Sequence, residues 1–181
     1  MPESMPKKRL STPLTVSRRS LLAGGSDEQF RGLIHDLIAY GHRLDACRDA
    51  FAAIIGVSGA QYEILMLVSR TDGLSVGEVA ARLHRSGAFI TIEANRLVER
   101  GILDKAADPA DGRKVILTRN RKTLQLLEHL APYQVRINDV LFDKLDAKRF
   151  RALRALASEL VSSGDRAVSM LDYLLREAEA A

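Results

Sequence analysis

The sequence contains a single cysteine, Cys47, and this scarcity excludes a disulfide bond within the chain. No group of histidines and cysteines has the spacing of a metal site, because the four histidines are scattered as His35, His42, His84 and His129. We therefore expect no bound metal, and a reducing cytoplasm is the natural compartment for such a chain.

Signatures of catalysis and of membrane insertion are also missing. The chain has no glycine-rich phosphate loop and no G-x-S-x-G motif, so we expect neither an enzyme nor a bound cofactor. The stretch "SRRSLLAGG" resembles part of a twin-arginine export signal, but its apolar part is only three residues long and acidic residues follow. No apolar run anywhere in the sequence is long enough to span a bilayer.

The charge balance is mildly basic, with 27 Lys and Arg against 23 Asp and Glu. A net charge of +4 suits a polyanionic partner without requiring one. Residues 1–26 form a basic arm, which is either a solvated tail or a segment that touches DNA phosphates or a partner subunit. Its charged residues are Glu3, Lys7, Lys8, Arg9, Arg18 and Arg19.

From Asp27 onward the pattern is mostly helical. Apolar residues recur at three- and four-residue steps and predict a long helix that ends near Gly56. This stripe is either core or a subunit interface; it contains Phe30, Leu33, Ile34, Leu37, Ile38, Leu44 and Phe51. A second helix is predicted to follow, because Ser58 stands three residues before Gln61 in the spacing of a capping box.

Two short helices joined by a tight turn come next and predict a helix-turn-helix. Ser75 and Glu78 form a second capping box before "VGEVAARL". Ser86 is the predicted N-cap of "GAFITIEANRLVER", which Gly101 can end in a left-handed conformation. Helical spacing places one set of residues inward, namely Ile90, Ala94, Leu97 and Val98. The opposite arc holds Ala88, Ile92, Asn95, Arg96 and Glu99, with Phe89 and Arg100 near its edge.

The segment "DPADGRKVILT" (108–118) predicts two short strands joined by a turn, and a hairpin directly after a helix-turn-helix is a wing. Its thin tip can enter the minor groove, where Arg113 meets concentrated negative potential. Asp108 and Asp111 can fix the direction of that guanidinium. The alternative is an ordinary surface turn with a solvated arginine.

The C-terminal third is again helical and strongly apolar on one face. Thr118 is the expected cap of one helix and Asp146 of a last long helix, which "SSGD" (162–165) interrupts by a kink or an end. This is more apolar helical surface than a small winged domain can cover. Much of it should therefore be buried between subunits.

The order of these elements resembles the MarR (multiple antibiotic resistance regulator) family over roughly residues 30–160. The most specific match is the D-P-x-D-x-R wing, here Asp108, Pro109, Asp111 and Arg113, followed by Leu117 and Thr118. The resemblance implies a homodimer that binds pseudo-palindromic operators, usually as a repressor, and releases DNA when a small molecule or oxidant arrives. It also implies a ligand cleft between the dimerisation helices and the DNA-binding lobe.

The expected fold is mainly α with a small β-hairpin wing: a winged helix-turn-helix lobe plus a helical dimerisation region. We expect a basic N-terminal arm (1–26), a dimerisation helix (27–57), the winged lobe (58–119) and C-terminal dimerisation helices (120–181). The partners are double-stranded operator DNA, a second copy and a small effector. The residues expected to contact DNA are Arg82, Arg85, Ser86, Ala88, Phe89, Thr91, Ile92, Asn95, Arg96, Asp111, Arg113 and Lys114.

The recognition helix departs from the family pattern, which commonly has arginine in the slot of Ile92 and leucine in that of Glu93. Its exposed arc is unusually apolar. Either Ile92 and Phe89 contact thymine methyl groups in the major groove, or both pack against neighbouring elements. Arg82, His84 and Arg85 suit phosphate contacts, which position a protein without specifying sequence.

Effector binding has weaker candidates. His42, Arg43 and Tyr62 lie where the first and second helices should converge, and each is alternatively an interface residue. Redox sensing through Cys47 is a further alternative, with Arg43 and Arg48 as sources of positive charge; a buried hydrophobic role is the plainer one. A rival to the operator-binding regulator is a winged-helix module for DNA architecture or protein interaction.

Overall fold

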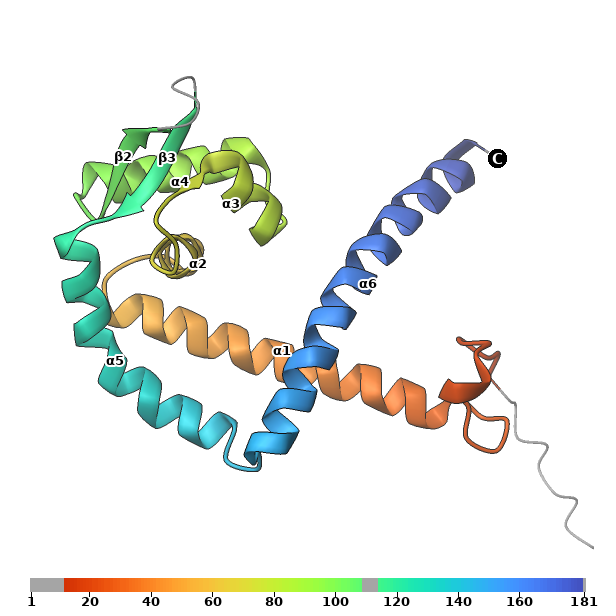
Figure 1. Ribbon diagram of the computed structural model, residues 1–181. Helices are drawn as coiled ribbons and strands as arrows, with labels where there is room; N and C mark the ends of the chain where they lie inside the picture. The colour runs from red at the N-terminus through yellow and green to blue at the C-terminus, as the bar shows by residue number, and fades with distance from the viewer. Residues whose placement is uncertain (1–11, 109–113, 181) are drawn as a thin grey trace, which may run out of the picture. The chain divides into compact units, whose positions relative to one another are not determined.

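The computed structural model describes residues 12–108 and 114–180, which form two compact units. The first ends at Pro132 and the second begins at Tyr133, so the helix that spans this boundary contributes to both. Figure 1 shows a chain that is mostly helical with one small sheet, which confirms the predicted fold class. In chain order the elements are η1 (Arg19–Leu21), α1 (Glu28–Ile54), α2 (Gly59–Val68), β1 (Leu74–Ser75), α3 (Val76–Leu83), α4 (Gly87–Glu99), β2 (Leu103–Ala107), β3 (Val115–Arg119), α5 (Arg121–Leu141) and α6 (Ala147–Ala180).

Most helix ends lie where local capping chemistry predicts them. The Ser58 hydroxyl accepts from the Gln61 N–H at 3.2 Å, and the Gln61 side chain accepts from the Ser58 N–H at 3.2 Å. Ser75 and Glu78 form the same reciprocal pair, and the Ser75 donors hold the pKa of the Glu78 carboxyl below its usual value. Gly101 ends α4 with a φ of +64°, as expected for a left-handed C-cap.

The sheet has one strand more than the sequence indicates. Its order is β1-β3-β2, all antiparallel, so the predicted hairpin of β2 and β3 gains β1 on its other edge. β1 pairs Leu74 with Leu117, and both side chains are buried beside Leu103. The sheet thereby anchors the wing to the core rather than leaving it as a free hairpin.

Two expectations for the C-terminal helices are wrong. Thr118 does not cap α5, because it pairs with Asp104 inside the β-ladder. The reciprocal bonds at this helix start join Asn120 and Thr123 instead, at 3.0 and 3.1 Å. The segment 162–165 does not interrupt α6, which runs helically through Gly164. An interior glycine costs only about 1 kcal/mol, which a helix of 34 residues can absorb.

The predicted cap of α6 is confirmed, since the Arg149 N–H donates to the Asp146 carboxylate at 2.7 Å. The described part of the second unit, residues 133–179, has no buried residue. Large apolar side chains lie exposed along α6, including Phe150, Leu153, Leu156, Leu160, Leu171 and Leu174.

The core of the first unit lies between α2, α3, α4, the sheet and the first half of α5. Its largest fully buried side chains are Ile64, Leu65, Val68, Val79, Ile90, Leu97, Ile102, Leu103, Leu117, Thr123 and Leu130. α1 joins this core only near its C-terminal end, through Phe51 and Ala52. The earlier part of its predicted apolar stripe is not core, because Leu33, Ile34, Leu37, Ile38 and Leu44 are exposed.

Among the described residues, no single helix is long and apolar enough to cross a membrane. Only α1 and α2 taken together have the length and apolar composition of a membrane span, and the two helices are bent by 85° at their junction.

The described part of the N-terminal arm, residues 12–26, is tied to the start of α1. Thr15 donates to the Asp27 carboxylate through its N–H and its hydroxyl, at 2.7 Å each, and Arg31 lies 3.0 Å from the other carboxylate oxygen. Arg31 also donates to the Pro13 carbonyl. These bonds, first from Arg31 and then from Thr15, hold the pKa of Asp27 far below its usual range.

Replacing Asp27 by asparagine should release this segment, because an amide cannot form the ion pair with Arg31. We expect trypsin to cleave the Asp27→Asn variant faster after Arg18 and Arg19, both of which are exposed. The Asp36→Asn variant, at an exposed carboxylate of the same helix, should match the wild type. Cleavage of Asp27→Asn at the wild-type rate would show that the contact does not hold the segment.

The same contact predicts a pH dependence. A carboxyl whose pKa is lower in the folded state stabilises that state above its unfolded pKa of about 4. The contribution decreases as the pH falls below that value and is lost as the pH passes through the lowered folded pKa. The Thr15 amide resonance should therefore keep its position from pH 7 to about pH 4 in the wild type, and shift only under stronger acid.

Candidate nucleic-acid interface

The turn between α3 and α4 sets the direction of the second helix. His84 closes α3 in the left-handed conformation, with φ at 50°, and the Arg85 N–H donates to the Ala80 carbonyl at 3.0 Å. Ser86 then caps α4, since its hydroxyl accepts from the Phe89 N–H at 3.2 Å. These bonds produce the compact helix-turn-helix that the sequence predicts.

α4 has a buried side and an exposed side. Ile90, Ala94 and Leu97 are buried in the core, as helical spacing predicts, and Val98 is half-buried. The outer side carries Ala88, Thr91, Ile92 and Arg96, which are all exposed, while Asn95 is half-buried. The side of α4 that is available to a partner is therefore the one expected to face DNA.

The polar groups on this outer side already have partners within the chain. The Thr91 hydroxyl donates to the Gly87 carbonyl at 2.8 Å. The carbonyl oxygen of the Asn95 side chain accepts from the ammonium of Lys105 in β2. The Arg96 guanidinium is paired with the Glu93 carboxylate. A partner that bonded to Asn95 or Arg96 would have to share or break these contacts.

The apolar groups on this side are uncovered to different degrees. Ile92 is 52% exposed, so the alternative in which it packs against neighbouring elements is wrong for this residue. Phe89 is 38% exposed, because the Arg85 guanidinium lies 5.8 Å from its ring centre in a cation–π contact. Ile92 is thus the largest uncovered apolar group in the outer face of α4.

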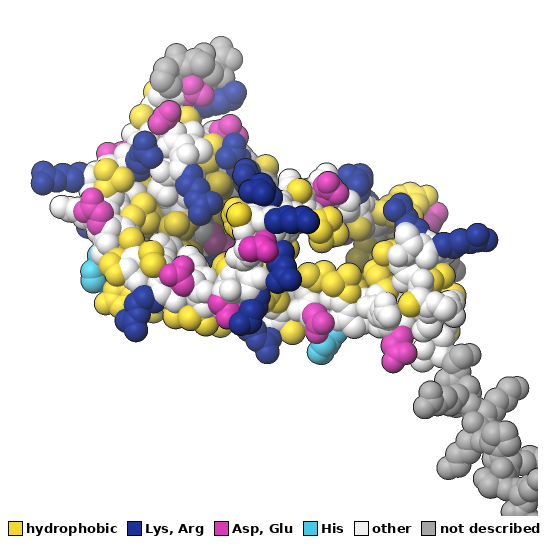
Figure 2. Space-filling view, turned by 60° about the horizontal axis from the view of Figure 1, so that its bottom comes forward, with side chains coloured by type: hydrophobic (Ala, Val, Ile, Leu, Met, Phe, Trp, Pro, Cys, Tyr) yellow, Lys and Arg dark blue, Asp and Glu magenta, His cyan; other side chains and the backbone are white. Residues whose placement is uncertain are grey.

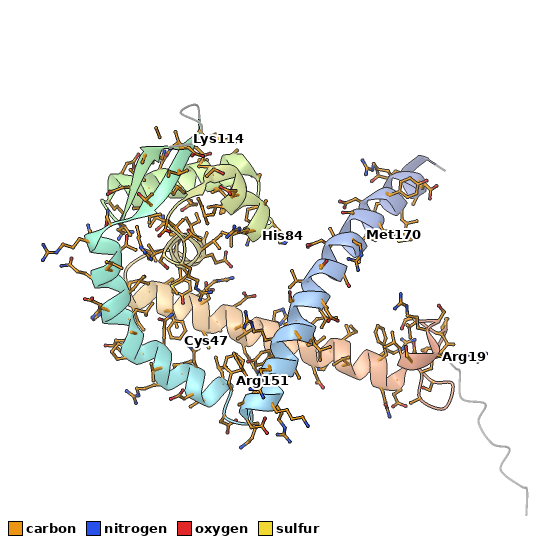
Figure 3. All side chains as sticks on the ribbon, viewed as in Figure 1. Arg19, Cys47, His84, Lys114, Arg151 and Met170 are labelled. Carbon is orange, nitrogen blue, oxygen red and sulfur yellow. The ribbon has the colours of Figure 1, made fainter. Side chains whose placement is uncertain are left out.

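Basic side chains surround this face without forming a uniformly positive surface. Arg82 and Arg85 lie exposed beside the turn, and Lys114 is exposed at the start of β3. Figure 3 shows the labelled His84 and Lys114 at separate places on the winged unit. On the face seen in Figure 2, cationic, acidic and apolar side chains are interspersed.

The wing is described only at its base. The Asp108 N–H donates to the Lys114 carbonyl at 2.9 Å and closes the β2–β3 hairpin there. Asp111 and Arg113, two of the predicted DNA contacts, lie outside the described residues. A hollow of about 330 Å³ beside this base is lined by Ser75, Val76, Gly77, Lys114 and Val115, so the first turn of α3 adjoins the wing.

A buried hydrogen bond beneath α4 is not predicted from the sequence. The Gln61 side-chain amide donates to the Glu93 carboxylate at 2.9 Å, and both side chains are buried. The Arg100 guanidinium donates to the Gly56 carbonyl at 2.8 Å. α4 is thus fastened to the junction of α1 and α2 near its middle and at its C-terminal end. The only signal in the sequence is the glutamate at position 93, where the family commonly has leucine.

The effector candidates fall into different surroundings. His42 is exposed on α1, and the exposed Arg43 donates to the Ala39 carbonyl of its own helix at 2.6 Å. Tyr62 is half-buried and its ring lies 6.3 Å from that of Phe51. The structure does not itself identify a common site for the three.

Cys47 has a free thiol and is half-buried against the core. The pKa of the neighbouring Tyr40 is raised, chiefly by burial and also by its proximity to Cys47. Arg48, the expected source of positive charge, is paired with Asp49, Asp45 and Glu63 at 2.8 to 3.1 Å. Because these carboxylates offset its charge, Arg48 stabilises a Cys47 thiolate little.

Comparison with known proteins agrees with this geometry. Residues 55–114 match the model of the MarR family. A comparison with curated protein sequences finds no match.

Solved structures share the fold at low sequence identity. A MarR protein from Peptoclostridium difficile has 18% identity and a TM-score of 0.62, covering 87% of this chain and 96% of that one. BpsR from Bordetella bronchiseptica, whose DNA binding is regulated by 6-hydroxynicotinic acid, has 23% identity and a TM-score of 0.56, with coverages of 70% and 91%. PcaV from Streptomyces coelicolor, a transcriptional regulator solved with its natural ligand, has 24% identity and a TM-score of 0.53, with coverages of 68% and 90%.

The bond between Gln61 and Glu93 predicts a swap experiment. Gln61→Glu keeps the acceptor for the Ser58 N–H but places two carboxylates together, and we expect it to lower the free energy of unfolding by about 1–3 kcal/mol at pH 7. Adding Glu93→Gln restores an amide–carboxylate bond and should recover most of the loss. Urea unfolding at pH 7 gives the free energy of unfolding of the wild type, of Gln61→Glu and of the swapped variant. A swapped variant as unstable as Gln61→Glu alone would contradict the assignment.

Proposed function

We propose that this chain is a repressor of the MarR type that binds a pseudo-palindromic operator as a homodimer, because residues 55–114 match the model of the MarR family, whose members are ligand-responsive transcription regulators. A small-molecule effector releases it from DNA. The observation that carries this proposal is the exposed outer side of α4, held between the arginines of the α3–α4 turn and the wing.

The proposed docking places α4 in the major groove, which is about 12 Å wide and admits a helix. Arg82, Arg85 and Ser86 then lie at the N-terminal end of α4, where cationic and hydroxyl groups can contact phosphates. Lys114 lies on the wing side, next to the segment that contains Arg113. In this proposal Arg113 enters the minor groove, where a narrow groove concentrates negative potential.

The homodimer is supported by apolar surface that each unit leaves exposed. In the first unit α1 exposes the stripe that begins at Leu33, and in the second unit α6 has no buried side chain among its described residues. Exposed apolar surface of this extent is typical of a subunit interface. A two-fold dimer also explains why the operator should be pseudo-palindromic, since its half-sites mirror the symmetry of the protein.

The proposed effector is a small molecule. BpsR and PcaV are described with a small aromatic acid and a natural ligand, respectively. His42, Arg43 and Tyr62 remain the candidate contacts for a small molecule in this chain. Redox sensing through Cys47 is a lesser alternative, which the pairing of Arg48 with carboxylates disfavours.

The first test is a fluorescence-anisotropy titration with duplex DNA from upstream of the protein's own coding region. A scrambled duplex of equal length and two salt concentrations provide the controls. We expect a preference of about 10³-fold or more, with an affinity that falls steeply as salt rises. Equal weak binding of both duplexes would contradict repression from this region, and sedimentation of the free protein as a monomer would contradict the homodimer.

A second test separates the operator-binding regulator from a protein-interaction module. In the regulator, Arg113→Ala should weaken binding to the preferred duplex about tenfold or more, because it removes the proposed minor-groove contact. Arg70→Ala, the same change at an exposed arginine between α2 and β1, is the matched control and should bind like the wild type. In a protein-interaction module, Arg113→Ala should leave binding to the duplex unchanged, as the control does.

A further inference from the structure

We propose that the outer face of α4 recognises thymine through its 5-methyl group, with Ile92 as the specificity-determining contact. This inference rests on the proposed function, because it requires α4 to lie in the major groove. It goes beyond that function by naming the base that each half-site must present. Three observations on α4 carry it.

The first observation is an uncovered apolar strip. Ile92 is 52% exposed although it lies on the helix that faces DNA in the proposed docking. Ala88, one turn earlier, is also exposed and lies on the same face. The two residues are separated by about 6 Å along the helix axis, which is close to two base-pair steps of about 3.4 Å. An apolar strip of this length can follow neighbouring bases within one half-site.

The second observation is that the polar neighbours of this strip are restrained. Lys105 occupies the acceptor of Asn95, Glu93 is paired with Arg96, and the Thr91 hydroxyl donates to its own helix. These side chains are therefore poorer readers of base edges than their exposure suggests. The apolar strip is the part of the outer face that requires no internal bond to be broken.

The third observation concerns Phe89, the other large apolar residue near this face. The Arg85 guanidinium covers its ring, so Phe89 is less exposed than Ile92. Arg85 can hold this position while its charge faces a phosphate. The ring is thus part of the support for a backbone contact, and Ile92 is left as the apolar group that reaches the bases.

The chemistry of the groove identifies the partner of such a strip. The only apolar group that a base pair presents in the major groove is the methyl of thymine. Cytosine and the purines present donors and acceptors there, and these would lose their water against Ile92 without gaining a hydrogen bond. Contact with Ile92 therefore favours thymine and disfavours the other bases.

The test begins with duplexes selected by the wild-type protein from a random-sequence pool. Within the selected site, each thymine is replaced in turn by uracil, which removes the methyl and leaves the base pairing unchanged. We expect one or two thymines per half-site at which uracil weakens binding about fourfold each, the loss for one buried methyl. Uracil in the flanking sequence is the control on the DNA and should have no effect.

The variant Ile92→Ala assigns the contact to its residue. At the thymine that Ile92 contacts, this variant should lose most of the fourfold preference over uracil, because the shorter alanine side chain no longer reaches the methyl. An exposed helical position tolerates alanine, so the fold should be unchanged. Arg82→Ala is the matched control: it should weaken binding to every duplex alike and keep the fourfold preference for thymine.

The outcomes separate this inference from the proposed function. If the pool yields no enriched sequence, the proposal that the protein binds a specific DNA sequence is wrong. If it yields a site at which uracil costs nothing, or if Ile92→Ala keeps the full preference for thymine, the regulator stands and the methyl contact is overturned. A loss of binding to a protein partner in Ile92→Ala, with DNA binding unchanged, would assign the strip to a protein surface instead.

Discussion

The outer face of α4 is determined by what holds the helix from beneath. Ile90, Ala94 and Leu97 bury one side in the core, and the Gln61 amide binds the Glu93 carboxylate in the same layer. Rotation of α4 about its axis would expose these apolar groups and leave the buried Gln61 amide without its acceptor, which is costly in a medium of low dielectric constant. The face offered to a partner is therefore fixed before any partner arrives.

Features encoded locally could be predicted from the sequence, and features that depend on distant contacts could not. The caps at Ser58, Ser75, Ser86 and Asp146 each depend on residues within a few positions. β1 is not predictable from its own residues, because Leu74 and Ser75 form a strand only when Leu117 and Ile116 lie beside them. Thr118 has the local features of a helix cap, but its pairing with Asp104 across the sheet decides its role.

The site shows the same division. Helical spacing predicts which residues of α4 are exposed, but it does not predict that Lys105 and Glu93 engage two of them. The apolar character of the outer face is visible in the sequence, yet only the structure shows that Ile92 lies uncovered while Arg85 shields Phe89. The candidate effector contacts are the least predictable residues, because His42 and Tyr62 lie on different helices with different exposure.

The pairing of Gln61 with Glu93 also constrains how this sequence can evolve. The Gln61 amide would be buried without an acceptor if Glu93 changed, and the buried Glu93 carboxylate would keep only Arg96 if Gln61 changed, so a change at one position favours a change at the other. Related chains with leucine at position 93 should accordingly differ at position 61 too. The two sites, 32 residues apart, are then inherited as a unit, and the apolar outer face of α4 is free to diversify independently of them.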